Sequence, residues 1–116
     1  MKEGDVVLTP IPQADGRTKN RPAVVLREMP PYSDLLVCGV STQLDQQVGG
    51  FDELIVPKDD DFAASGLLVA SVIRLGFLAV LPRKRILGSI GSISPHRDKR
   101  LLKNLSDHLL QSLQAE

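Results

Sequence analysis

Short apolar runs, separated by polar, glycine-rich or proline-rich segments, dominate the first 93 residues. We interpret these runs as strands, because β-branched and aliphatic residues suit a half-buried pleated surface and Gly, Pro and Asp favour turns. The predicted strands cover residues 6–9, 23–26, 35–41, 51–57, 67–74, 77–81 and 86–93. Short strands at such close spacing predict a mainly β protein built as a small barrel.

Polar and proline-rich segments between these runs predict the connections. Pro10 and Pro12 close the first run, so residues 11–21 are expected to form a long loop. Residues 29–34, 42–50 and 58–66 are also expected to be turns or loops, the last with room for one helical turn. Glycines within residues 86–93 predict a bulge or a sharp bend in the last strand.

The hydrophobic period changes beyond Ser94 and Pro95. The leucines that follow the i, i+3, i+4 rule of an amphipathic helix are Leu101, Leu102, Leu105, Leu109, Leu110 and Leu113. Ser94 is expected to cap this helix and Pro95 to occupy its first position. A chain of 116 residues is near the usual size of one domain. We therefore predict a single domain over residues 1–116, with a barrel over about 4–93 and a helix over about 95–114.

Composition indicates a globular protein without a strong overall electric field. Hydrophobic residues make up 42% and charged residues 24%, and the formal net charge is zero, which excludes a disordered chain. The charge is uneven, since residues 83–116 hold seven Lys or Arg against three Asp or Glu. Only three Phe and one Tyr are present, so any contact with nucleic acid must rely on Arg, Lys and backbone groups rather than on base stacking.

A single cysteine, Cys38, excludes an intramolecular disulfide and a thiolate metal cluster, and we expect it to be a small core residue. The first residues lack the layout of a signal peptide. No apolar stretch approaches the length of a membrane helix. We therefore expect a cytoplasmic protein without a membrane partner.

Arg21 is the first candidate for chemistry. It directly precedes Pro22 and the apolar run 23–26, and proline restricts the backbone of the residue before it, so Arg21 is expected to leave the loop in a defined direction. The alternative is an ordinary arginine at a hairpin exit. Ser41, Thr42 and Gln43 end another apolar run, where hydroxyls can be held beside this loop, or where the strand simply turns.

Several common kinds of site are absent from the sequence. There is no Gly-x-x-x-x-Gly-Lys phosphate loop, no Gly-x-Ser-x-Gly elbow and no zinc-ligand spacing. Residues 59–61, three aspartates, are interpreted as a solvated turn. His96 and His108 lie about three helical turns apart and are expected at the surface. We predict no metal site and no cofactor.

Motifs spread over most of the chain resemble, in register, the MazF/PemK family of toxin ribonucleases. They are residues 4–8, 15–16, 19–26, 40–43, 71–74, 81–82 and 86–91. The resemblance implies an SH3-like barrel of the MazF/PemK/CcdB type with a C-terminal helix. It also implies a homodimer that cleaves single-stranded RNA without metal, and that a partner antitoxin inhibits. Contact with DNA is expected only indirectly, through the antitoxin.

The same resemblance assigns roles to individual residues. The catalytic arginine of the family falls on Arg21 and its catalytic threonine falls on Ser41, which keeps the hydroxyl group. Relatives often carry aromatic residues after the first strand, where this chain has Ile-Pro-Gln at 11–13. We expect four further residues to bind RNA: Arg17, Lys19, Thr42 and Gln43.

The chemistry of RNA cleavage agrees with these roles. Without metal, the 2′-hydroxyl attacks the adjacent phosphorus, and the enzyme must stabilise a phosphorane with extra negative charge. A guanidinium at Arg21 can engage two phosphoryl oxygens at once, and Ser41 can hydrogen-bond the same phosphate or relay a proton. Arginine is a poor general base because its pKa is so high, so the base stays unassigned.

Two other functions are compatible with the same sequence. One is a toxin that acts on DNA gyrase through the C-terminal helix, and the other is an SH3-like binding module without activity. Neither requires Arg21 or Ser41. For the expected dimer, residues 71–74 and 86–93 are the first candidates for the contact and the leucine face of the helix is the second.

Overall fold

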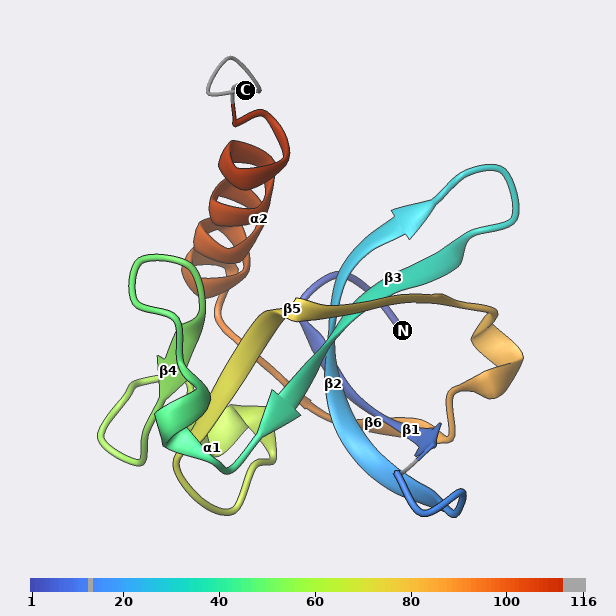
Figure 1. Cartoon of the computed structure of the whole chain (residues 1–116), viewed down its shortest axis with the longest axis horizontal. Coiled ribbons are helices and arrows are strands. Elements are labelled where there is room, and N and C mark those ends of the chain that lie inside the picture. Colours follow the sequence, from blue (N-terminus) through green and yellow to red (C-terminus); the bar gives the residue numbers. More distant parts are fainter. Residues whose placement is uncertain (13, 112–116) are drawn as a thin grey trace.

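The computed structural model describes residues 1–12 and 14–111. Six antiparallel strands form one sheet in the order β4-β5-β3-β2-β1-β6, which curls into a half-barrel (Figure 1). The strands are β1 (Asp5–Pro12), β2 (Thr18–Met29), β3 (Asp34–Ser41), β4 (Glu53–Ile55), β5 (Ser71–Leu81) and β6 (Gly88–Ser92). The helical elements are η1 (Leu44–Gln46), α1 (Phe62–Ser65), η2 (Arg83–Arg85) and α2 (Pro95–Leu109). This architecture confirms the predicted fold class, mainly β with a C-terminal helix.

The hairpin of β1 and β2 corrects the loop predicted over residues 11–21. The two strands pair as far as Pro12 opposite Thr18, so Arg21 lies inside β2, opposite Thr9, and not at the mouth of a loop. Residue 13 of that loop is outside the described residues. On its other side, β1 pairs with β6 only up to Leu8. Pro10 and Pro12 therefore lie where β1 has no partner strand on one edge. Because prolines have no N–H group, their position on this edge costs the sheet no hydrogen bond.

The prediction of two strands over residues 67–74 and 77–81 is wrong. The structure has one strand there, β5, which begins only at Ser71. Its register against β3 jumps between the pairs Cys38–Leu78 and Gly39–Arg74, which leaves residues 75–77 as an insertion where the strand bends (Figure 1). Gly39 makes this bend possible, since a Cβ added there would lie 2.9 Å from the Phe77 ring. The bend places Arg74 and Phe77 beside the end of β3.

Smaller differences concern the edges of the sheet. β4 has three residues instead of the seven predicted, and β6 has five instead of eight. The bulge predicted from the glycines of the last strand is confirmed, since the register between β1 and β6 shifts from Val6–Gly91 to Val7–Ser89. Cys38 is buried as predicted, and burial raises the pKa of its thiol.

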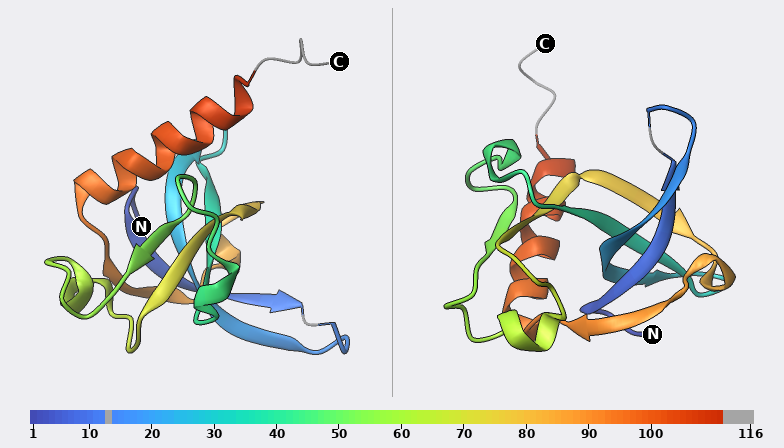
Figure 2. Two further views of the ribbon diagram at one scale, coloured as in Figure 1. Left: turned by 60° about the vertical axis from the view of Figure 1, so that its left-hand side comes forward. Right: turned by 90° about the horizontal axis from the view of Figure 1, so that it is seen from below.

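α2 begins as predicted and packs across one face of the half-barrel (Figure 2). The Ser94 hydroxyl accepts a hydrogen bond from the Arg97 N–H at 3.1 Å, and Pro95 occupies the first helical position. Leu101 and Leu105 enter the core, whereas Leu109 and Leu110 are 69% and 79% exposed. The helix ends at residue 109, before the predicted 114; Leu113 lies outside the described residues.

Arg97 connects α2 to the sheet through a cluster of carboxylates. The Arg97 side chain is buried and donates to Asp61 at 2.8 and 3.0 Å, to Glu53 at 3.0 Å and to Asp59 at 3.1 Å. Burial alone would raise the pKa of Asp61, but hydrogen bonds from Arg97 and from the Ser94 backbone outweigh it and lower this pKa to about 2. The interpretation of residues 59–61 as a solvated turn is therefore wrong for Asp61.

Candidate active site

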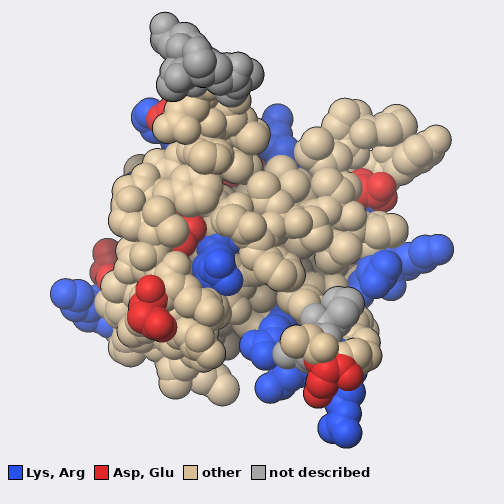
Figure 3. All heavy atoms as spheres, in the orientation of Figure 1, with Lys and Arg blue, Asp and Glu red and all other residues tan. Residues whose placement is uncertain are grey.

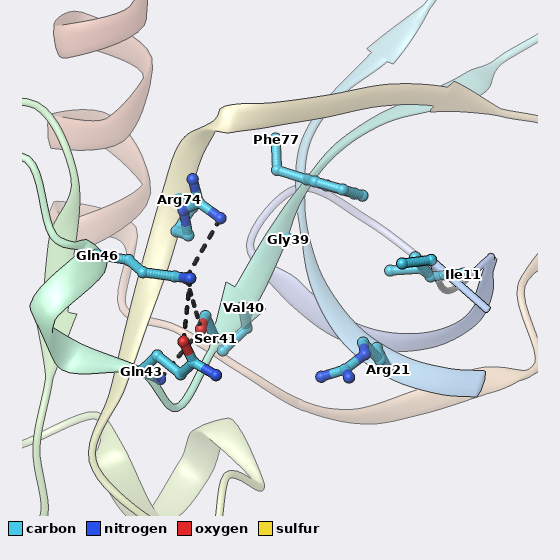
Figure 4. A pocket seen from close by; sticks show the side chains of 10 residues that line it. Ile11, Arg21, Gly39, Val40, Ser41, Gln43, Gln46, Arg74 and Phe77 are labelled. Carbon is cyan, nitrogen blue, oxygen red and sulfur yellow. Dashed lines mark hydrogen bonds between the residues drawn. The ribbon is translucent and has the colours of Figure 1, made fainter. Parts of the chain in front are cut away.

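A pocket of about 280 Å³ opens between the β1–β2 hairpin and the ends of β3 and β5 (Figure 4). The backbone brings its walls together from segments far apart in sequence, through the pairing of β1 with β2 and of β3 with β5. The residues that line it are Ile11, Ala14, Arg21, Gly39, Val40, Ser41, Gln43, Gln46, Arg74 and Phe77.

Arg21 forms one wall of this pocket. It lies in β2 next to Pro22, and its side chain is partly buried. Figure 4 shows the guanidinium pointing from β2 toward the side of the pocket that carries Ser41 and Gln43. Pairing of Arg21 with Thr9 of β1, and of β2 with β3 from Ala23 onward, fixes the backbone from which this side chain projects. The guanidinium is therefore presented by a rigid element, as precise positioning of a binding group requires.

Ser41 forms the opposite wall, at the last position of β3. Its Oγ accepts a hydrogen bond from the Gln43 N–H at 3.1 Å, so the turn after the strand holds the hydroxyl in place. The same hydroxyl donates to Gln46 Oε1 at 3.1 Å. Both bonds leave the oxygen at the pocket surface, where it can interact with a bound group.

Gln46 and Arg74 complete this wall (Figure 4). Gln46 Oε1 also accepts a hydrogen bond from Arg74 Nη1 at 3.3 Å, and Gln46 Nε2 donates to Gln43 Oε1 at 3.2 Å. One neutral amide thus links the hydroxyl of Ser41 to the guanidinium of Arg74. Two guanidinium groups and one hydroxyl facing the same cavity form a site suited to an anion with several oxygen atoms.

Comparison with known protein families decides which class of protein carries this site. The model of a family described as PemK-like, MazF-like toxin of type II toxin-antitoxin system matches residues 2–109. The chain belongs to this family. No curated protein matches the chain. Membership makes the chain a toxin-family protein whose system includes an antitoxin protein as its partner, as the motifs in the sequence indicated.

Three of the six residues selected from the sequence lie in the pocket of this PemK-like protein: Arg21, Ser41 and Gln43. The other three do not line it. Thr42 is exposed, and Arg17 and Lys19 lie on the exposed part of the β1–β2 hairpin. Figure 3 shows Lys and Arg side chains gathered over the end of the molecule that carries this hairpin and η2.

Sequence reasoning missed Gln46, Arg74 and Phe77 as residues of the PemK-like pocket. Gln46 lies in the segment predicted to be an exposed loop, and η1 gives it its position. Arg74 belongs to a matched motif that was considered only as a dimer contact. The one available signal was Gly39 inside an apolar strand, since a glycine there often marks the close approach of another group.

The PemK-like chain was also expected to lack a metal site and a membrane helix. Within the part of the chain that the structure describes, no three His, Cys, Asp or Glu residues are grouped so that they could hold a metal ion. Among the same residues, no helix is long and apolar enough to cross a membrane. His96 and His108 are exposed, as predicted, and the His108 ring lies 5.0 Å from the ring of Phe51.

Proposed function

We propose that the chain is a metal-independent endoribonuclease, which cleaves single-stranded RNA at defined sequences and thereby inhibits translation and growth. One observation carries this proposal: Arg21 and Ser41, the positions that match the catalytic residues of the family, line the same pocket. They come from different strands and are 20 positions apart in sequence.

The proposed reaction is an internal transfer at phosphorus. The 2′-oxygen attacks the neighbouring phosphorus and loses its proton, the bond from phosphorus to the 5′-oxygen breaks, and the 5′-oxygen takes up a proton. The products are a 2′,3′-cyclic phosphate and a 5′-hydroxyl. Arg21 stabilises the phosphorane, because its guanidinium donates two hydrogen bonds to oxygens that gain negative charge in the transition state.

Ser41 is proposed to bind the same phosphate. Its hydroxyl donates to the neutral acceptor Gln46 Oε1 in the structure, and a phosphoryl oxygen offers a charged acceptor in exchange. Arg17 and Lys19 stand on the exposed hairpin beside the pocket and would guide the RNA backbone, whereas Thr42 and Gln43 contact nucleotides at the end of β3. In this mechanism no step requires a metal ion or a cofactor.

A homodimer is proposed on the basis of apolar side chains that the single chain leaves exposed. Leu78 and Val80 of β5 are 40% and 52% exposed, and Leu87 before β6 is 59% exposed. Covering them with a second copy would take this apolar surface out of contact with water. Light scattering is expected to give twice the chain mass of 12.6 kDa at tens of micromolar. A monomer that still cleaves RNA would contradict the dimer.

A dimer would also gather cations from two copies into one RNA-binding field. Arg17, Lys19 and Arg21 of each copy would contribute, together with Lys84 and Arg85 of η2. Arg83 is less suited to this role, because it already pairs with Glu28 at 2.9 Å. The antitoxin is proposed to carry an acidic, partly disordered segment that orders on binding to this field.

The test of the proposed function is incubation of the purified chain with a long single-stranded RNA in excess EDTA. Primer extension is expected to map cuts at a small number of recurring sequences, and the Ser41→Ala variant is expected to make the same cuts more slowly. Intact RNA would contradict the proposal. Intact RNA together with altered plasmid supercoiling in cells expressing the protein would indicate a gyrase-directed toxin instead.

A further inference from the structure

Among the residues that the structure describes, Arg74 has no carboxylate partner, whereas four other arginines each have one. Arg27, Arg83, Arg97 and Arg100 each pair with an Asp or Glu at 3.1 Å or less. Among the described residues, Arg74 forms no ion pair, and its hydrogen bond goes to the neutral Gln46 Oε1 at 3.3 Å. A partly buried guanidinium that faces a pocket without a counter-charge favours binding of an anion there.

Gln46 occupies the position that such an anion would take. Its Oε1 accepts hydrogen bonds from Ser41 at 3.1 Å and from Arg74 at 3.3 Å, which are the bonds that one phosphoryl oxygen could accept. Hydrogen bonds from these donors to an ionised oxygen are about twice as strong as those between neutral groups. The Gln46 side chain is exposed and comes from the three-residue η1, so it can move aside at little cost.

We propose that Arg74 is a second phosphate-binding residue of the pocket, and that Gln46 holds Arg74 and Ser41 ready until an RNA phosphate replaces its amide oxygen. This inference rests on the proposed ribonuclease function. Arg21 from β2 and Arg74 from β5 then bind RNA from opposite walls of one cavity (Figure 4). Phe77, three residues after Arg74 on the same strand, offers a 44% exposed ring on which an adjacent base can stack.

The first test compares Arg74→Gln with Arg100→Gln, which removes the same charge from an exposed arginine of α2. The probe is an RNA that cannot react, with 2′-O-methyl groups throughout, and its affinity is measured by fluorescence anisotropy over a series of KCl concentrations. Arg74→Gln is expected to weaken binding by about tenfold or more. It should also reduce the slope of log affinity against log salt by about 0.7, the value for one phosphate contact on a single strand.

The second test adds a competing charge at Gln46. In Gln46→Glu the carboxylate would pair with Arg74 and repel the phosphate, so we expect binding weaker by more than about tenfold. Gln47→Glu adds the same charge one position on, at a residue that does not line the pocket, and is expected to change the affinity less than about threefold. Thermal unfolding of all four variants shows whether each is folded.

The outcomes separate this inference from the function on which it rests. If wild-type protein cleaves RNA but Arg74→Gln has the affinity and salt slope of Arg100→Gln, the role of Arg74 is wrong and the ribonuclease function stands. If wild-type protein neither binds nor cleaves RNA, the proposed function fails, and the role of Arg74 fails with it.

Discussion

Arg21→Lys is expected to slow RNA cleavage by about 100-fold or more, because removal of one donor to transition-state charge usually has an effect of this size. Lysine keeps the positive charge but presents it as a point, whereas the guanidinium offers a planar pair of donors that matches two phosphoryl oxygens. Single-turnover cleavage of an end-labelled RNA measures the chemical step separately from binding.

Arg27→Lys is the matched control for this variant. Arg27 lies in the same strand, β2, but its side chain is 62% exposed and pairs with Glu3, away from the pocket. The cleavage rate of Arg27→Lys should stay within about twofold of the wild-type rate, since exposed ion pairs contribute little. If Arg21→Lys cleaves RNA as fast as this control, Arg21 has no special role in catalysis.

Arg97→Met is expected to lower the free energy of unfolding by about 3 to 5 kcal/mol, the usual effect of removing one partner from a buried ion pair. The methionine would fill part of the space but leave the carboxylate of Asp61, which is only 8% exposed, without its main donor. Arg100→Met removes an exposed partner of Glu53 from the same helix and should cost less than about 1 kcal/mol. Urea unfolding measures both.

The stability of the Arg97 cluster should also depend on pH. The pKa of Asp61 is lowered in the folded protein to about 2 from an ordinary value of 3.8. The stabilisation is therefore present above pH 3.8 and is lost as the pH falls from 3.8 toward 2. Arg97→Met should lose this acid dependence. Equal unfolding free energies for Arg97→Met and Arg100→Met would show that the cluster is not what connects α2 to the sheet.

Features that depend only on residues close together in the sequence could be predicted from it. Ser94 and Pro95 mark the start of α2 because capping and the restricted backbone of proline act within one turn. The apolar run at residues 35–41 predicts β3 because its length and composition suit a buried strand. Arg21 and Ser41 could be selected from their motifs alone.

Features that depend on the pairing of distant segments could not be predicted in this way. Pro10 ends a strand by local rules, yet β1 continues past it because no strand pairs with that edge. Gly39 signals that some group approaches the strand closely, but the sequence does not show that this group is the Phe77 ring. Gln46 and Arg74 are 28 positions apart, and only the packing of η1 against β5 makes them part of one site.

The chemical nature of the cut ends tests most directly whether this pocket cleaves RNA by attack of the 2′-hydroxyl. Wild-type protein is incubated in excess EDTA with an RNA of one mapped cleavage site, and the fragments are examined by mass spectrometry and by labelling with polynucleotide kinase. We predict a 2′,3′-cyclic phosphate on one fragment and a 5′-hydroxyl on the other, with no cleavage when the nucleotide at the site is 2′-deoxy. A 5′-phosphate beside a 3′-hydroxyl, or cleavage of the 2′-deoxy substrate, would contradict the mechanism.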